Sequence, residues 1–241
     1  MKKSILSLIL VAFSLGAALS SAARADDILW KLDFKDIAAG KPLAEVPYAM
    51  PCYGPQKVVT DAQNTLVGAQ TLDTLSPALV FTKGSNSHYT PAFTLRANGA
   101  ISTGVVTVKF DVAFDAMTVD AAHPVETLMA VPFLNAQGGS DFVLVIVATG
   151  PNDLVLGGSN LAKGKAPLKF KLGDVVHIKA VLDLDHHTFQ AFLNDAPMAD
   201  PEHDDQKFNN FLGLTVRDGT ALGGNNGGTF TAGIANLVVS H

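Results

Sequence analysis

The chain has 241 residues, of which 48% are hydrophobic and 16% charged, with 21 glycines and 12 prolines. This composition excludes an intrinsically disordered chain, a coiled coil and a collagen-like fibre. The chain carries 17 basic against 22 acidic residues, so we expect no nucleic-acid partner, because such a partner requires clustered Lys and Arg.

The first 25 residues have the pattern of an export signal. Two lysines precede an apolar run at residues 5–19, and Ala23-Arg24-Ala25 places small residues where signal peptidase reads them. The run is shorter than the roughly 20 residues that cross a bilayer. We expect cleavage after Ala25, which leaves a secreted or periplasmic mature chain with no membrane span.

Residues 26–241 suit one all-β domain in size. Without Lys2, Lys3 and Arg24 this mature chain carries 14 basic and 22 acidic residues, a net charge of −8. Cys52 is the only cysteine, so no internal disulfide is expected and the hydrophobic core must supply the stability. The sequence does not indicate a role for Cys52.

Alternating apolar and polar residues predict strands from the start of this domain. In residues 28–34 (ILWKLDF), Ile28 and Trp30 share the apolar face, and we expect Trp30 to be buried. Residues 106–114 (VTVKFDVAF) place five apolar side chains on one face and Ala113 with three polar residues on the other. Residues 142–148 form an apolar run of strand length.

The same alternation continues toward the C-terminus. Residues 175–184 and 188–194, separated by a short DHH turn, predict a hairpin. Three further strands are expected at residues 211–216, 229–234 and 235–239. Residues 37–91 contain six prolines and only short apolar runs, so loops and short edge strands are expected there. Short strands without a helical period predict a sandwich or a barrel.

Three segments resemble parts of the concanavalin A-like jelly rolls, in particular the laminin-G-like branch of secreted bacterial proteins. Gly173–Asp195 is similar to the central hairpin, whose two strands close on residues that match Asp183 and Asn194. Ile234–Ser240 looks like the closing strand that returns beside the N-terminal strand, and Leu32–Leu43 resembles the opening strand and its Gly turn. The resemblance implies a single jelly-roll β-sandwich of two packed antiparallel sheets over residues 26–241.

Glycosidases of this fold place two carboxylates on one strand in the pattern E-x-D-x-x-E, because the two groups must flank the scissile bond. The chain has three glutamates, Glu45, Glu126 and Glu202. The nearest match runs from Glu202 to Lys207, with Lys207 in place of the last glutamate. This segment has no apolar alternation, so it is expected to be a solvated loop without a catalytic role.

Two turns concentrate acidic residues and histidines. Asp183 and Asp185 lie beside His186 and His187, and Asp204 and Asp205 follow His203. Oxygen-rich turns suit Ca²⁺, whereas paired imidazoles favour zinc or copper. A structural Ca²⁺ held by Asp183, Asp185, Asp204 and Asp205 is therefore one interpretation. The simpler alternative is that these side chains satisfy the geometry of their turns.

Four residues are candidates for contact with a sugar. His177 lies on the polar face of its strand, where a cross-strand hydrogen bond is the simpler role. Tyr48, Tyr53 and Tyr89 fall in the irregular region and offer an aromatic platform. The glycine-rich run 223–228 lacks the lysine of a phosphate loop and is expected to connect two strands.

The sequence therefore predicts a secreted, non-catalytic carbohydrate-binding or adhesive module whose partner is a polysaccharide or a cell-surface glycan. Two alternatives are a polysaccharide-cleaving enzyme of the same fold, either hydrolase or lyase, and a structural envelope protein. The jelly-roll architecture itself does not decide among them, because it hosts lectins, hydrolases, lyases and adhesive modules.

Overall fold

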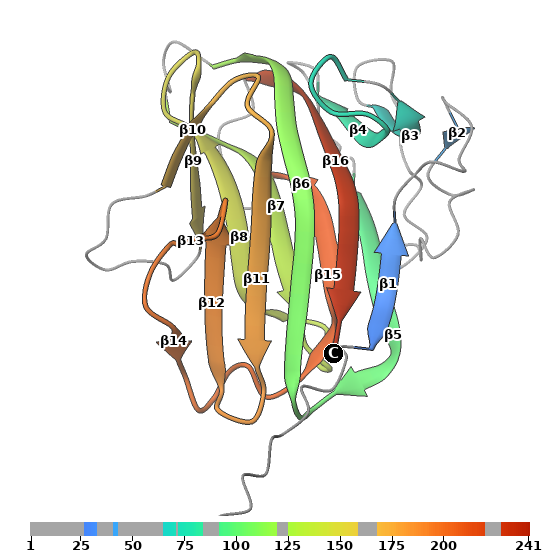
Figure 1. The fold of residues 1–241 in the computed structure, drawn as a ribbon, viewed down its shortest axis with the longest axis vertical. Coiled ribbons are helices and arrows are strands. Elements are labelled where there is room, and N and C mark those ends of the chain that lie inside the picture. The colour runs from blue at the N-terminus through green and yellow to red at the C-terminus, as the bar shows by residue number, and fades with distance from the viewer. Residues whose placement is uncertain are drawn as a thin grey trace, which may run out of the picture.

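The computed structural model describes residues 27–32, 41–42, 65–70, 72–83, 92–119, 125–158, 168–219 and 228–241. Within these ranges the chain forms strands and turns and no α-helix, and two antiparallel sheets pack face to face (Figure 1). The β-sandwich implied by the resemblance is confirmed. The expected export signal lies outside the described residues.

The larger sheet faces the viewer in Figure 1 and contains ten strands. Its spatial order is β13 (Ala196–Pro197), β12 (Thr188–Leu193), β11 (Val176–Asp183), β6 (Val105–Thr118), β16 (Thr229–Ser240), β4 (Ala78–Lys83), β3 (Thr65–Gln70) and β2 (Lys41–Pro42). Two further strands join it at the side: β1 (Ile28–Leu32) pairs with β16, and β14 (Glu202–His203) pairs with β12.

The smaller sheet lies behind the larger one and contains six strands. Its spatial order is β10 (Leu168–Lys171), β9 (Asp153–Gly158), β8 (Ser140–Ala148), β7 (Glu126–Leu134), β15 (Phe211–Asp218) and β5 (Ala92–Ile101). Every pairing in both sheets is antiparallel among the described strands.

The main core fills the space between the sheets and contains a group of aromatic rings that joins them. Phe189 on the larger sheet stacks on Phe142 of the smaller sheet, with ring centroids 3.7 Å apart and an interplanar angle of 27°. Phe133 packs edge-on against the Phe189 ring, with ring centroids 5.5 Å apart. These contacts bury large apolar areas from both sheets at one point, which stabilises their packing.

A second, smaller core lies on the outer face of the larger sheet. Leu72, Leu75, Ala78 and Val80 form a buried cluster with Ala113 and Ala235. Ala113 was predicted on the polar face of its strand, but it is fully buried. Its side chain does point away from the main core, and the segment that precedes β4 covers it there.

The predicted hairpin is confirmed as β11 and β12, paired from Ile178↔Leu193 to Asp183↔Thr188. Residues 229–234 and 235–239 were predicted as two strands, but they form one strand, β16. An irregularity between Ala235 and Val238, with Asn236 at φ 51°, interrupts the alternation without ending the strand. β16 lies beside β1, as the resemblance implied.

The expectation for β1 was partly wrong. Trp30 is half-buried and packs against Phe211, with ring centroids 6.1 Å apart. Ile28, expected on the same apolar face, is 62% exposed. The pairing with β16 shifts register between Ile28 and Trp30, so the two side chains do not share one buried face.

Residues 37–91 contain the short strands β2, β3 and β4 at one side of the larger sheet, in agreement with the sequence. Residues 202–207 were expected to be a loop, but Glu202 and His203 form β14 and pair with Phe189 and Thr188. None of the described residues forms a helix long and apolar enough to cross a membrane.

Candidate functional site

Tyr48, Tyr53 and Tyr89, predicted as a platform for a sugar ring, lie outside the described residues, as do Glu45 and Cys52. Their roles stay predictions. The other predicted site residues, His177 and four aspartates, fall on the larger sheet and its turns.

His177 is exposed on the outer face of the larger sheet. It lies directly opposite Asp111 in the β11–β6 pairing, and its Nδ1 is 2.5 Å from the Asp111 Oδ1 atom. Asn236 donates from Nδ2 to the other Asp111 oxygen at 2.7 Å, and Asn194 Oδ1 accepts from the His177 backbone N–H at 2.8 Å. The cross-strand contact expected as the simpler role is present. A sugar contact at His177 stays a prediction.

Asp183 and Asp185 organise the turn between β11 and β12. Asp183 accepts from the backbone N–H groups of Asp185 and His186 at 3.2 and 3.1 Å, and its second oxygen is 2.8 Å from His186 Nδ1. Partial burial raises the pKa of Asp183, but the hydrogen bonds and charge of His186 outweigh burial, so the net pKa lies below its ordinary value of 3.8. Asp185 accepts from Gly104 N at 3.0 Å.

Asp204 and Asp205 lie in the neighbouring turn. Asp204 accepts from Gln206 N at 2.9 Å and pairs with Lys207 Nζ at 3.1 Å; these contacts, the Gln206 bond foremost, lower the pKa of Asp204. The backbone joins the two turns, because Asp204 N donates to His187 O at 3.1 Å.

The structure thus brings the two predicted Ca²⁺-binding turns together but engages their aspartates in turn contacts. Within the described residues, no group of three or more His, Cys, Asp or Glu side chains is arranged to hold a metal ion. Asp183, Asp185 and Asp204 accept backbone N–H groups, which is the alternative role expected of them. A Ca²⁺ site at these four positions stays a prediction.

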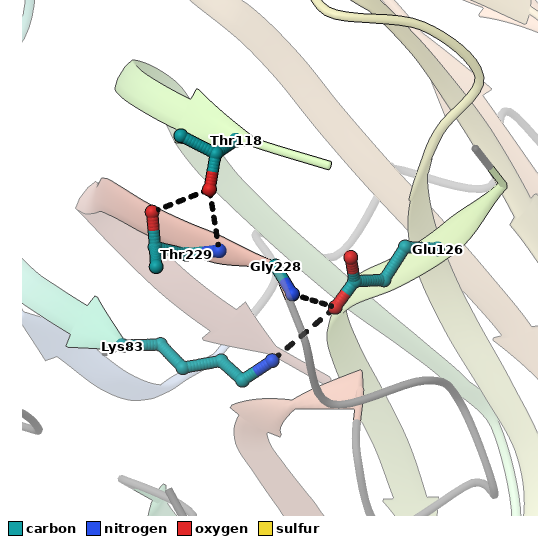
Figure 2. Close-up of polar contacts among 5 residues, drawn as sticks. All are labelled: Lys83, Thr118, Glu126, Gly228 and Thr229. Atoms are coloured by element: carbon teal, nitrogen blue, oxygen red, sulfur yellow. Dashed lines mark hydrogen bonds and ion pairs between the residues drawn. The ribbon is translucent and has the colours of Figure 1, made fainter. Parts of the chain in front are cut away.

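A buried ion pair that the sequence analysis missed lies between the sheets, where β4 ends and β7 begins (Figure 2). Lys83 Nζ is 3.3 Å from Glu126 Oε1, and the two residues are only 3% and 1% exposed. Gly228 N donates to the same oxygen at 3.2 Å. A Cβ at Gly228 would stand 2.0 Å from Glu126 Oε2, so a larger residue there would displace the Glu126 carboxylate. The pair is 43 residues apart in sequence, which is why no local pattern indicates it.

Two arginines lie on the outer face of the smaller sheet. Leu95, Leu214 and Val216 point into the main core, so the residues that alternate with them on β5 and β15 point outward. Thr94 and Thr215, directly opposite each other, share a buried 2.7 Å hydrogen bond. Arg96 and Arg217 flank this threonine pair, one on each strand, and both are half-buried.

The arginines stand on a face whose remaining described residues are mostly small and apolar. Ala130 of β7 lies directly opposite Arg217, and Val143 and Val155 continue the face on β8 and β9. At its far edge Lys171 pairs with Asp153, so that carboxylate is already neutralised. The described part of this face therefore carries positive charge on a chain whose net charge is −5.

Comparison with solved structures places the fold. A sialidase aligns with a TM-score of 0.52 at 12% identity, over 75% of this chain and 16% of the sialidase. The fold is a jelly-roll β-sandwich. The chain spans 16% of the length of that sialidase. An alginate lyase of polysaccharide lyase family 7 aligns with a TM-score of 0.46 at 14% identity, over 71% of this chain and 85% of the lyase. An alginate lyase from Pseudomonas aeruginosa aligns with a TM-score of 0.45 at 13% identity, over 72% of this chain and 88% of that lyase.

No family model and no curated protein matches the chain. The structural neighbours nevertheless correct the leading expectation from the sequence, which was a non-catalytic binding or adhesive module. The neighbours reported above are all named as enzymes. That expectation is therefore withdrawn.

Proposed function

We propose that the protein is a polysaccharide-cleaving enzyme that binds an acidic polysaccharide across the outer face of the smaller sheet. The observation that supports this proposal is the placement of Arg96 and Arg217 on either side of the Thr94–Thr215 hydrogen bond. The proposal retains the expected export, so the substrate would be met outside the cytoplasm.

The two arginines suit carboxylated sugars. A guanidinium group presents a planar fork of N–H donors that binds a carboxylate through two parallel hydrogen bonds. Arg217 Nε is buried and has no hydrogen-bond partner, so it is a donor that a bound carboxylate could satisfy. Arg217 pairs with Ala92, four residues along β5 from Arg96, which separates the two arginines by about 13 Å along the strands. One polymer chain could therefore meet both.

This arrangement favours a lyase among the polysaccharide-cleaving enzymes. In a uronic acid residue, an arginine that neutralises the carboxylate stabilises the negative charge that develops when a base removes the neighbouring C5 proton. The electron pair then forms the C4–C5 double bond, and the C4–O bond breaks with protonation of the departing oxygen. Glu126, by contrast, is a poor candidate for a glycosidase carboxylate, because it is buried and engaged by Lys83 and Gly228.

The described residues supply the carboxylate-binding groups of this scheme. Tyr48, Tyr53 and Tyr89, which lie outside the described residues, remain predicted sugar contacts.

A polysaccharide panel tests the proposal. The protein is incubated with acidic polymers, such as alginate and polygalacturonate, and with neutral polymers, such as laminarin, and both unsaturated and reducing ends are measured. We expect unsaturated ends from at least one acidic polymer and none from neutral polymers. Reducing ends without unsaturation would indicate a hydrolase and overturn the lyase assignment. No product from any polymer would overturn the enzyme proposal itself.

A further inference from the structure

A row of side chains crosses the outer face of the larger sheet at right angles to its strands. The pairing places Lys31 of β1 opposite Val238 of β16, Val238 opposite Lys109 of β6, and Lys109 opposite Lys179 of β11. Lys179 lies opposite Phe192 of β12. Directly opposite residues project from the same face, so these five side chains form one continuous line, which we call the lysine row. Figure 1 shows the strands that carry it side by side, in the order β1, β16, β6, β11 and β12.

The lysine row faces away from the core. The residues on either side of Lys109, Lys179 and Val238 along their strands belong to the main core, so the row itself points outward. Lys31 and Lys109 are exposed, and Val238, Lys179 and Phe192 are half-buried. With strands about 4.8 Å apart, the row is about 19 Å long. This is an extended surface, suited to a linear partner.

The charge of the row is largely uncompensated. Lys109 and Lys179 stand directly opposite each other, an arrangement of like charges that destabilises a sheet. Lys179 Nζ lies 4.1 Å from the Phe192 ring centroid and 4.0 Å from Asp195, an exposed carboxylate at the edge. The other nearby carboxylate, Asp111, is taken by His177 and Asn236. Among the described residues, Lys31 and Lys109 have no ion-pair partner.

We infer that the lysine row is a second binding surface for an acidic polysaccharide, on the face of the sandwich opposite Arg96 and Arg217. The choice of an acidic polysaccharide as the ligand rests on the proposed function. A polyanion would relieve the Lys109–Lys179 repulsion, and the aliphatic stems of the lysines with Val238 and Phe192 provide apolar contact for sugar rings. A surface of this kind holds a long polymer near the enzyme and raises its effective concentration at the other face.

The affinity for a long acidic polymer tests the inference separately from cleavage. Lys109→Gln/Lys179→Gln is compared with Lys207→Glu, which lowers the net charge by the same two units outside the row and outside the arginine face. All proteins also carry Arg217→Ala, and binding to alginate and to polygalacturonate is measured by calorimetry. Thermal unfolding checks that each variant folds.

We expect the row variant to lose roughly tenfold in affinity, since two exposed charge contacts contribute about threefold each. The control variant should stay within about twofold. Equal losses of affinity in both variants would overturn the inference, because binding would then follow net charge. No loss of affinity in the row variant would also overturn it, because the polymer would then not bind this face. If binding depends on the row but the unmodified protein releases no product, the proposed function fails while the second surface stands.

Discussion

Glu126 is a carboxylate buried where its charge is poorly solvated. Its carboxylate and the Lys83 ammonium are almost completely removed from water, which costs several kcal/mol per ion unless the partner is present. The backbone N–H of Gly228 adds a third contact (Figure 2). The three groups come from the end of β4, the start of β7 and the start of β16, so the pair joins three chain segments between the sheets.

Removing only one member of this pair should be strongly destabilising. We expect Lys83→Met to lower the free energy of unfolding by about 3–5 kcal/mol at neutral pH, because the Glu126 charge would be buried without a partner. The double variant Lys83→Met/Glu126→Leu should recover most of that loss, since neither charge remains. Denaturant unfolding of both proteins measures the difference. A single variant as stable as the unmodified protein would show that the carboxylate is not held in the buried position described.

Asp183 should contribute a pH-dependent part of the stability. Its pKa in the folded protein lies below the ordinary value, so its contribution is fully present above about pH 4 and is lost as the pH falls through the folded pKa. Asn at this position can still accept the backbone N–H bonds of the turn but cannot titrate. We expect Asp183→Asn to lose less stability than the unmodified protein between pH 6 and about pH 3, as followed by thermal unfolding. Parallel stability curves would contradict the assignment.

At the scale of the strands, the alternation of apolar and polar residues predicted a strand only where one face is buried and the other is exposed to solvent. β6, β11 and β12 have this pattern and were predicted. β7 is buried along nearly its whole length on both faces, so it shows no alternation. Leu72 and Leu75 cover Ala113 from outside, a contact between distant segments that a period of two cannot reveal.

The arginine site was missed because it, too, forms only through a contact between segments far apart in the sequence. β5 contains small and polar residues, and its register with β15 shifts between Phe211 and Gly213, so no regular pattern marks Arg96 as part of a sheet face. Arg96 and Arg217 come together only through the β5–β15 pairing. Asp183 and Asp204 were visible in the sequence because their turn partners are within three residues of them.

Gly213 shows how closely β5 approaches β15. A Cβ at Gly213 would stand 1.9 Å from the Leu95 backbone oxygen, whereas a Cβ at Gly99 would meet nothing within 4 Å. We expect Gly213→Ala to cost about 1–3 kcal/mol of stability, because a backbone atom must move, and the matched Gly99→Ala variant to be close to neutral. Denaturant midpoints measure both changes. Equal effects would mean that the two strands are not in the register described here.

At the scale of the whole molecule, a chain with net charge −5 presents cationic groups on the outer faces of both sheets. Arg96 and Arg217 occupy the smaller sheet, and the lysine row crosses the larger one. The central aromatic packing stabilises the jelly roll, while the arginines and the lysine row lie outside this core on the two sheets. The central claim is that the arginine face binds and cleaves an acidic polysaccharide.

The most direct test of that claim is the initial rate of unsaturated-end formation on an acidic polysaccharide by the unmodified protein, Arg217→Ala and Arg217→Lys, with Lys207→Gln as the control. We predict that Arg217→Ala loses at least about a hundredfold in kcat/KM, as expected when a donor that stabilises developing charge is removed. Arg217→Lys should recover only part of the rate, because a single ammonium cannot reproduce the bidentate contact. Full activity in Arg217→Ala, with the fold intact, would contradict the account.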